Sequence, residues 1–186
     1  MAPPVDRFIH IIEENNLSPE DIEKVEYTPH AIALNRMWRE NDLKTEEDFG
    51  FHGPYLIACA AYRIKSIDFQ SPNVRTDPRI REFMKKVKVL PNPHENFGPA
   101  MLDDPMARVL SIEVWVKGQT FKETTGCTQW SCSIDGFRAT DEDLINKFKE
   151  IASGLLPSEK LEKAPVSLLK LEEFEDLNYL MEMVRH

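Results

Sequence analysis

The feature that most constrains the fold of this chain is a pair of alternating segments joined by a short turn. Residues 108–116 and 120–128 flank the tripeptide Lys117-Gly118-Gln119. Successive side chains of a β-strand point to opposite faces. In the first segment Leu110 and Ile112 therefore share one face, opposite Ser111. Gly118 supplies the positive φ of a tight turn, so the pattern predicts a β-hairpin. Its apolar face needs a second layer of structure to cover it.

Two further segments read as strands. Residues 22–28 alternate, with Ile22, Lys24, Glu26 and Thr28 on one side and Glu23, Val25 and Tyr27 on the other. Pro29 ends this pattern because proline restricts the residue before it. Residues 87–90 form a shorter alternating run that Pro91 stops. With the hairpin, the chain therefore predicts about four strands.

The remaining periodic segments predict helices. The most buried of them covers residues 54–65, where almost every side chain is apolar and Pro54 fits the first helical position. Asp77 and Thr140 are suited to cap two other helix starts. The helical segments predicted are residues 4–15, 31–38, 54–65, 78–86, 140–153 and 168–185. The charged segment 39–48 and the segments 66–76 and 92–104 are predicted to be loops.

This order of elements predicts an α+β fold with a mostly antiparallel sheet of about four strands. Helices are expected to pack on one face of the sheet, with additional helices at the C-terminus. We expect a main domain over residues 1–157 and a helical appendage over residues 158–186 that packs on it.

Composition excludes several classes of function. The net charge of −9 disfavours nonspecific binding to nucleic acid, which depends on phosphate neutralisation by Lys and Arg. No apolar run reaches the roughly 18 residues of a membrane span, and the N-terminus lacks an apolar signal core. Of the three cysteines, Cys127 and Cys132 have no second pair nearby, so reduced structural thiols are expected. We predict a protein of the cytoplasm that binds neither nucleic acid nor membrane.

Tyr55 is the first candidate site residue. It lies in the first turn of the apolar helix, after Phe49-Gly50-Phe51-His52-Gly53, a segment predicted to be flexible. A helix N-terminus offers free N–H groups and partial positive charge, so a carboxylate can dock there. A phenol in that turn could bind the carboxylate or transfer a proton. The alternative is an aromatic side chain that only packs in the core.

His52 is the second candidate, as a substrate-binding residue. A histidine three residues before Tyr55 could bind an anion or transfer a proton near neutral pH. The alternative is a loop or helix-capping histidine. His10, His30 and His94 are weaker candidates because none has a partner nearby in the sequence.

Metal, nucleophile and phosphate motifs are absent from the sequence. No H-x-x-x-H, E-x-x-H or C-x-x-C spacing occurs, so neither a metal nor another cofactor is expected. The chain also lacks a nucleophile elbow and a glycine-rich phosphate loop. The basic run at residues 85–88 is interpreted as a solvated helix end, with anion binding as the alternative.

Five phrases in order resemble the C-terminal part of the MmgE/PrpD family. They are PEDIEKVEYTPHA, FGFHGPYLIACAAY, DPRIREFMKKVKVLPNP, RVLSIEVWVKGQTFKET and TDEDLINKFKEIASGLLP, within residues 5–182. This family includes 2-methylcitrate dehydratases and cis-aconitate decarboxylases. The resemblance implies an active site between a large helical domain and this small domain. It also implies that Tyr55 matches a tyrosine facing the cleft and that the main acids and bases come from the helical domain.

Two functions follow from the resemblance. In the first, the chain is the small subunit of a split lyase that acts on a di- or tricarboxylate, completes its active site with a helical partner and assembles into an oligomer. In the second, it is a non-catalytic binding or assembly module, or an orphaned fragment. A missing partner would leave an apolar surface exposed, to which Phe49, Phe51, Phe97 and Met101 are the expected contributors.

Overall fold

The computed structural model describes residues 3–29, 43–91, 110–125 and 139–185. By its internal contacts the chain divides into an N-terminal unit, Met1–Thr128, and a C-terminal unit, Gln129–His186. Each unit is considered by itself. The helix predicted at 31–38, the loop predicted at 92–104 and the residues His30, His94, Phe97, Met101, Cys127 and Cys132 lie outside the described residues.

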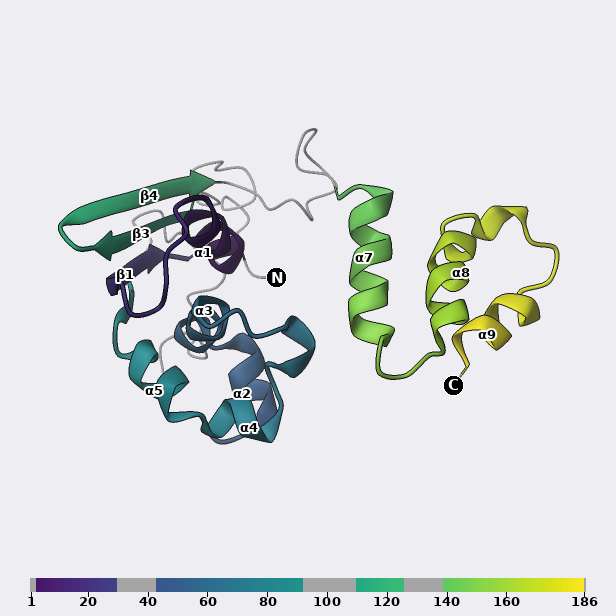
Figure 1. The fold of residues 1–186 in the computed structure, drawn as a ribbon, viewed down its shortest axis with the longest axis horizontal. Helices are drawn as coiled ribbons and strands as arrows, with labels where there is room; N and C mark the ends of the chain where they lie inside the picture. The colour runs from purple at the N-terminus through teal and green to yellow at the C-terminus, as the bar shows by residue number, and fades with distance from the viewer. Residues whose placement is uncertain (1–2, 30–42, 92–109, 126–138, 186) are drawn as a thin grey trace, which may run out of the picture. The chain divides into compact units, whose positions relative to one another are not determined.

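The N-terminal unit contains a four-stranded sheet in the order β2-β1-β3-β4 (Figure 1). The strands are β1 Ile22–Thr28, β2 Val87–Val89, β3 Leu110–Val116 and β4 Gln119–Thr125. The predicted α+β class and number of strands are therefore confirmed. One detail differs, because β1 and β2 are parallel and the sheet is mixed. Helices lie in the connection between these two strands, as parallel neighbours require.

The predicted hairpin is confirmed in β3 and β4, which pair from Val116 with Gln119 to Leu110 with Thr125. The turn consists of Lys117 and Gly118, whose φ angles are 47° and 81°. Two consecutive residues with positive φ match the twist of the flanking strands, which is why this turn closes a two-residue hairpin. Gln119, predicted to be part of the turn, is the first residue of β4.

An irregularity in β1 changes which side chains face the core. The register shifts between Ile22 and Lys24, as in a β-bulge. Ile22 is therefore buried together with Val25 and Tyr27, although simple alternation places it with Lys24. A bulge inserts one residue into the strand and reverses the facing of the residues before it.

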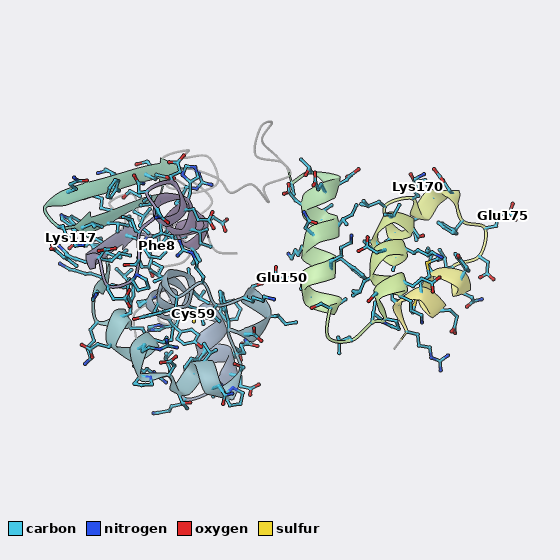
Figure 2. All side chains as sticks on the ribbon, in the orientation of Figure 1. Phe8, Cys59, Lys117, Glu150, Lys170 and Glu175 are labelled. Carbon is cyan, nitrogen blue, oxygen red and sulfur yellow. The ribbon has the colours of Figure 1, made fainter. Side chains whose placement is uncertain are left out.

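The described helices of this unit lie on one face of the sheet, as predicted. Helix α1, Pro3–Glu14, contacts β3 and β4, and α3, Gly53–Ala61, contacts α1 and α5, Pro78–Met84. The core between them contains Phe8, Val25, Ile57, Phe83, Ile112 and Val114, all at most 2% exposed. Figure 2 shows the dense packing of side chains around Phe8 and Cys59. The opposite face carries ion pairs, such as Lys24 with Glu26 at 2.6 Å.

Two segments predicted to be loops contain short helices. Helix α2, Glu46–Phe51, begins at Thr45, whose side chain accepts from the N–H of Asp48 while Asp48 accepts from the N–H of Thr45. This reciprocal capping box stabilises a helix start inside a highly charged segment. Ser66–Asp68 is a 3₁₀ turn, and Pro72–Thr76 forms α4. The apolar helix α3 ends at Ala61, earlier than predicted, and Arg63 after it has a φ of 52°.

The C-terminal unit consists of α7 Asp141–Ala152, α8 Ser158–Leu168, the 3₁₀ turn Leu171–Glu173 and α9 Asn178–Val184. Thr140 caps α7 as predicted, again in a capping box with Asp143. The helical region predicted at 168–185 is interrupted, and only its last part is an α-helix. Within this unit α7 packs on α8, and Lys149 pairs with Glu162 at 2.6 Å. The domain boundary at residue 157 stays a prediction.

The C-terminal unit buries little apolar surface among its described residues. Its buried side chains include Ala152, Ala164 and Leu180, whereas Leu155 is 64% and Met181 63% exposed. Within the ranges described, no helix combines the length and the apolar character needed to cross a bilayer. Exposed apolar side chains of this kind, such as Leu155 and Met181, are candidates for contact with another protein.

Candidate functional site

His52 connects two helices at the position where the sequence predicts a site. It is the last cap of α2 and the first cap of α3, and its Nδ1 accepts from the backbone N–H of Tyr55 at 3.2 Å. The side chain is fully buried, at 0% exposure. The structure thus places His52 as a helix cap, the alternative to substrate binding that the sequence left open.

Tyr55 lies in the first turn of α3 and is also fully buried, at 0% exposure. Its hydroxyl donates to the backbone carbonyl of Phe69 at 2.5 Å. Its ring packs edge-to-face on Phe49, with centroids 4.9 Å apart and planes at 79°. Burial raises the pKa of Tyr55 above the ordinary value of a phenol, so the hydroxyl stays protonated and donates.

Most of the N–H groups at the start of α3 are not available to bind an anion. Pro54 has no N–H, and the N–H of Tyr55 bonds to His52. The N–H of Leu56 donates to the backbone carbonyl of His52 at 3.0 Å. The carboxylate docking predicted for this helix end therefore has no support in the geometry.

Cys59 lies one helical turn after Tyr55 and is completely buried. Burial raises the pKa of its thiol to about 12, so the thiolate that a nucleophile needs is not formed near neutral pH. The cysteine is free, as the sequence predicts. It contributes packing to the core and is not a nucleophile.

Two guanidinium groups lie close to the Phe49 ring that contacts Tyr55. Arg81 is 5.0 Å and Arg75 5.7 Å from its centroid. Arg75 pairs with Glu46 at 3.0 Å, and the Nε of Arg81 donates to the carbonyl of Arg75 at 3.2 Å. These contacts join α2, α4 and α5 around Phe49. The positive charges of both arginines lower the pKa of Tyr55, but burial is the larger effect and the pKa stays raised.

Neither Tyr55 nor His52 lines a cavity described in either unit. A cavity of about 210 Å³ lies between α1 and α3, and another of about 420 Å³ lies beside the end of α5. The first is lined by Ile9, Ile12, Glu13, Ala60, Arg63, Ile64 and Phe69. The second is lined by Arg81, Met84, Lys85 and Val87. Phe69 links Tyr55 to the first cavity, because its carbonyl accepts the Tyr55 hydroxyl and the residue also lines that cavity.

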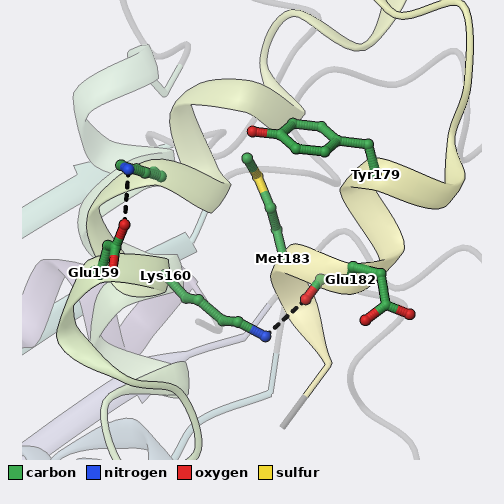
Figure 3. Close-up of a pocket in the computed structure, with 6 residues that line it drawn as sticks. Glu159, Lys160, Tyr179, Glu182 and Met183 are labelled. Carbon is green, nitrogen blue, oxygen red and sulfur yellow. Dashed lines mark hydrogen bonds and ion pairs between the residues drawn. The ribbon is translucent and has the colours of Figure 1, made fainter.

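A third cavity, of about 270 Å³, lies in the C-terminal unit between α8 and α9 (Figure 3). Lys160 donates to the backbone carbonyl of Glu182 at 2.7 Å and Lys163 pairs with Glu159 at 2.8 Å. At the edge of this cavity, Tyr179 stacks on Phe174, with ring centroids 5.9 Å apart. Lys160 therefore joins α8 to α9, whereas the pair of Lys163 and Glu159 lies within α8.

The structure thus brings Tyr55, Phe49 and two arginines together. Around them, the described residues do not include an exposed acid and an exposed base that could act as a pair. Sequence reasoning missed Arg75, Arg81 and Phe69 as neighbours of Tyr55. Arg81 shares a helix with the Asp77 cap, but no periodicity in the sequence relates it to Tyr55. A direct catalytic role would require the hydroxyl of Tyr55 to leave the Phe69 carbonyl.

Comparison with known proteins identifies one family and one relative. Residues 1–172 match the family model of the MmgE/PrpD C-terminal domain. The chain is also similar to a protein of Mus musculus described as cis-aconitate decarboxylase, with 29% identity over 183 residues. That match covers 94% of this chain and 34% of the mouse protein. The chain therefore spans about a third of the length of this relative.

Proposed function

Because the chain belongs to the MmgE/PrpD family, whose C-terminal domain it matches over residues 1–172, we propose that it is the small subunit of a lyase. The resemblance that the sequence predicted is confirmed. In this proposal a separate helical domain completes the active site. The substrate is a di- or tricarboxylate, in keeping with the cis-aconitate named for the mouse relative.

The observation that carries the proposal is the extent of the match. It covers 94% of the chain and 34% of the relative, so this domain corresponds to about a third of such an enzyme. The predicted site residues Tyr55 and His52 are also buried and hydrogen-bonded in the structure. An acid and a base within reach of the substrate are needed to remove and deliver protons. In the proposal these groups come from the partner.

Exposed apolar side chains support a partner. Of the residues expected at this surface, Phe51 is 50% exposed, whereas Phe49 is only 4% exposed and packs under Arg75 and Arg81. The C-terminal unit adds Leu144, Ile151, Leu155, Val166, Leu177 and Met181 to the exposed apolar side chains. Large exposed apolar surfaces mark sites of interaction. Assembly into an oligomer and a cytoplasmic location stay predictions.

A non-catalytic binding or assembly module is the second candidate. The observation in its favour is the engagement of Tyr55 and His52, whose polar groups hold the structure around α3. In that case the chain retains the fold of the family and binds a helical partner without chemistry. Binding is common to both candidates, and turnover separates them.

The purified chain is expected to show no turnover of cis-aconitate or 2-methylcitrate by itself. Added to the helical domain of an MmgE/PrpD lyase at equal concentration, it should produce measurable decarboxylation or dehydration, because the two parts together supply the acid, the base and the substrate contacts. Product formation is followed by chromatography.

The helical domain alone is the control, and it too should be inactive. Turnover by the isolated chain would place the chemistry in this domain and contradict the proposal. A stable complex of the two parts that turns over neither substrate would favour the non-catalytic module.

A further inference from the structure

One cluster of potential metal ligands lies outside the residues discussed so far. It consists of His10 and Glu14 on α1 and Glu123 on β4. One ligand atom from each residue lies within 4.8 Å of the others. His10 and Glu14 are one helical turn apart and therefore share a helix face. Glu123 reaches the same place from the hairpin, 113 residues away in the sequence from His10.

The imidazole of His10 lies between the two carboxylates. Its Nε2 is 3.3 Å from an Oε1 of Glu14, and its Nδ1 contacts Oε1 of Glu123. Zinc binds nitrogen and oxygen at about 2.0–2.2 Å, so two ligands of a tetrahedral zinc ion lie about 3.4 Å apart. One ion binds only one nitrogen of the imidazole, so the carboxylate that faces the other nitrogen has to move. The distance from Nε2 to Glu14 already has the required separation. No two of the three ligand atoms are more than 4.8 Å apart, which exceeds that separation by roughly 1.4 Å.

Arg7 holds the carboxylate of Glu123 from the other side. Its Nη1 is 3.4 Å from Oε2, while Oε1 faces His10. Glu123 lies on the face of the sheet that α1 covers, and its side chain is 20% exposed. A residue that orients a ligand from behind is a recurrent feature of metal sites. The Glu123 oxygen nearest His10 is therefore placed before any ion binds.

The charges around the cluster come from two elements. Glu14 and Glu123 are negative, Arg7 is positive, and Asp6 lies one turn before His10 with its buried Oδ2 unpaired among the described residues. With a neutral imidazole, the two carboxylates and Arg7 leave one net negative charge, to which Asp6 adds another when it is ionised, and a negative charge attracts a divalent cation. A protonated His10 that pairs with both carboxylates is the competing explanation, and it needs no metal.

We propose that His10, Glu14 and Glu123 form a binding site for a divalent transition metal, with zinc as the ion that fits its donors. One imidazole nitrogen and two carboxylate oxygens are ligands that zinc accepts, and three protein ligands leave a coordination position for water. The side chains of His10 and Glu14 are 46% and 63% exposed, so the ion enters directly from solvent. The sequence predicted no metal, because the spacing His10-x-x-x-Glu14 lacks its third ligand until the hairpin docks.

Titration of zinc chloride into chelator-treated chain, followed by calorimetry, tests the site. We expect one saturable zinc site per chain and a rise of the melting temperature of the N-terminal unit, because the folded state alone presents all three ligands. His10→Ala and Glu123→Gln should each weaken binding by at least about tenfold, since even residues that only support a ligand contribute this much. All three side chains reach solvent, so the variants should fold.

Glu13→Gln is the matched control, because it removes one carboxylate from the neighbouring position of the same helix. It should leave the zinc affinity unchanged. Equal affinity in His10→Ala and the unaltered chain would overturn the proposal, as would heats that do not saturate. Either result would leave the cluster as an ion pair between His10 and its two acidic neighbours.

Discussion

Replacing Phe8 with alanine is expected to lower the free energy of unfolding of the N-terminal unit by about 3–5 kcal/mol. Phe8 is 0% exposed and packs edge-to-face against Phe83, with ring centroids 6.4 Å apart. Removing the ring deletes contacts between α1 and α5 and leaves a cavity in the centre of the core. Since whole domains are stable by about 5–15 kcal/mol, this loss is a large share of the total.

The effect is measured by urea unfolding, followed through the backbone amide NMR signals of β1 and β3. Phe51→Ala is the matched control, because the same side chain is removed from a position that is 50% exposed. The control should change the unfolding free energy by less than about 1 kcal/mol. A loss below about 1 kcal/mol for Phe8→Ala would contradict the placement of α1 on the sheet.

A direct role for Tyr55 requires that binding of the helical partner frees its hydroxyl from the Phe69 carbonyl. In that case replacing Tyr55 with phenylalanine is expected to reduce turnover of the reconstituted lyase by at least about tenfold. A positioned acid–base group contributes about 10²–10⁴-fold and a hydrogen bond to a charged group about 1.5–3 kcal/mol. The variant Tyr55→Phe is also expected to lose about 1–2 kcal/mol in unfolding free energy, because the carbonyl of Phe69 loses its hydrogen-bond donor. Steady-state kinetics and urea unfolding of the same variant separate the two effects.

His52→Ala is the companion variant. It removes the acceptor of the Tyr55 N–H, so it should lower stability by about 1 kcal/mol, and its effect on turnover should be smaller than that of Tyr55→Phe. Unchanged kinetics together with reduced stability in Tyr55→Phe would show that the first turn of α3 is architecture. That result would favour the non-catalytic module.

Local signals in the sequence predicted local structure well. Gly118 and the alternation around it predicted the hairpin, and Asp77 and Thr140 predicted two helix starts that the structure confirms. These signals act within a few residues. Thr45 and Asp48 carried the same kind of signal for α2, but the charge of the surrounding segment led to the prediction of a loop.

Long-range features could not be predicted in the same way. The parallel pairing of β1 with β2 depends on where the helices between them return the chain. The environment of Tyr55 depends on a backbone carbonyl, that of Phe69, which leaves no mark on residue type. The register shift in β1 likewise depends on the partner strand, so alternation alone placed Ile22 on the wrong face.

The division of the chain into two units affects what its stability means. A single free energy of unfolding is defined only when a chain melts cooperatively, in one transition. The N-terminal unit has the larger core, whereas the described part of the C-terminal unit buries few large apolar side chains. A calorimetric scan of the whole chain is therefore expected to contain two unequal transitions, and a van 't Hoff analysis that treats them as one underestimates the total enthalpy of unfolding.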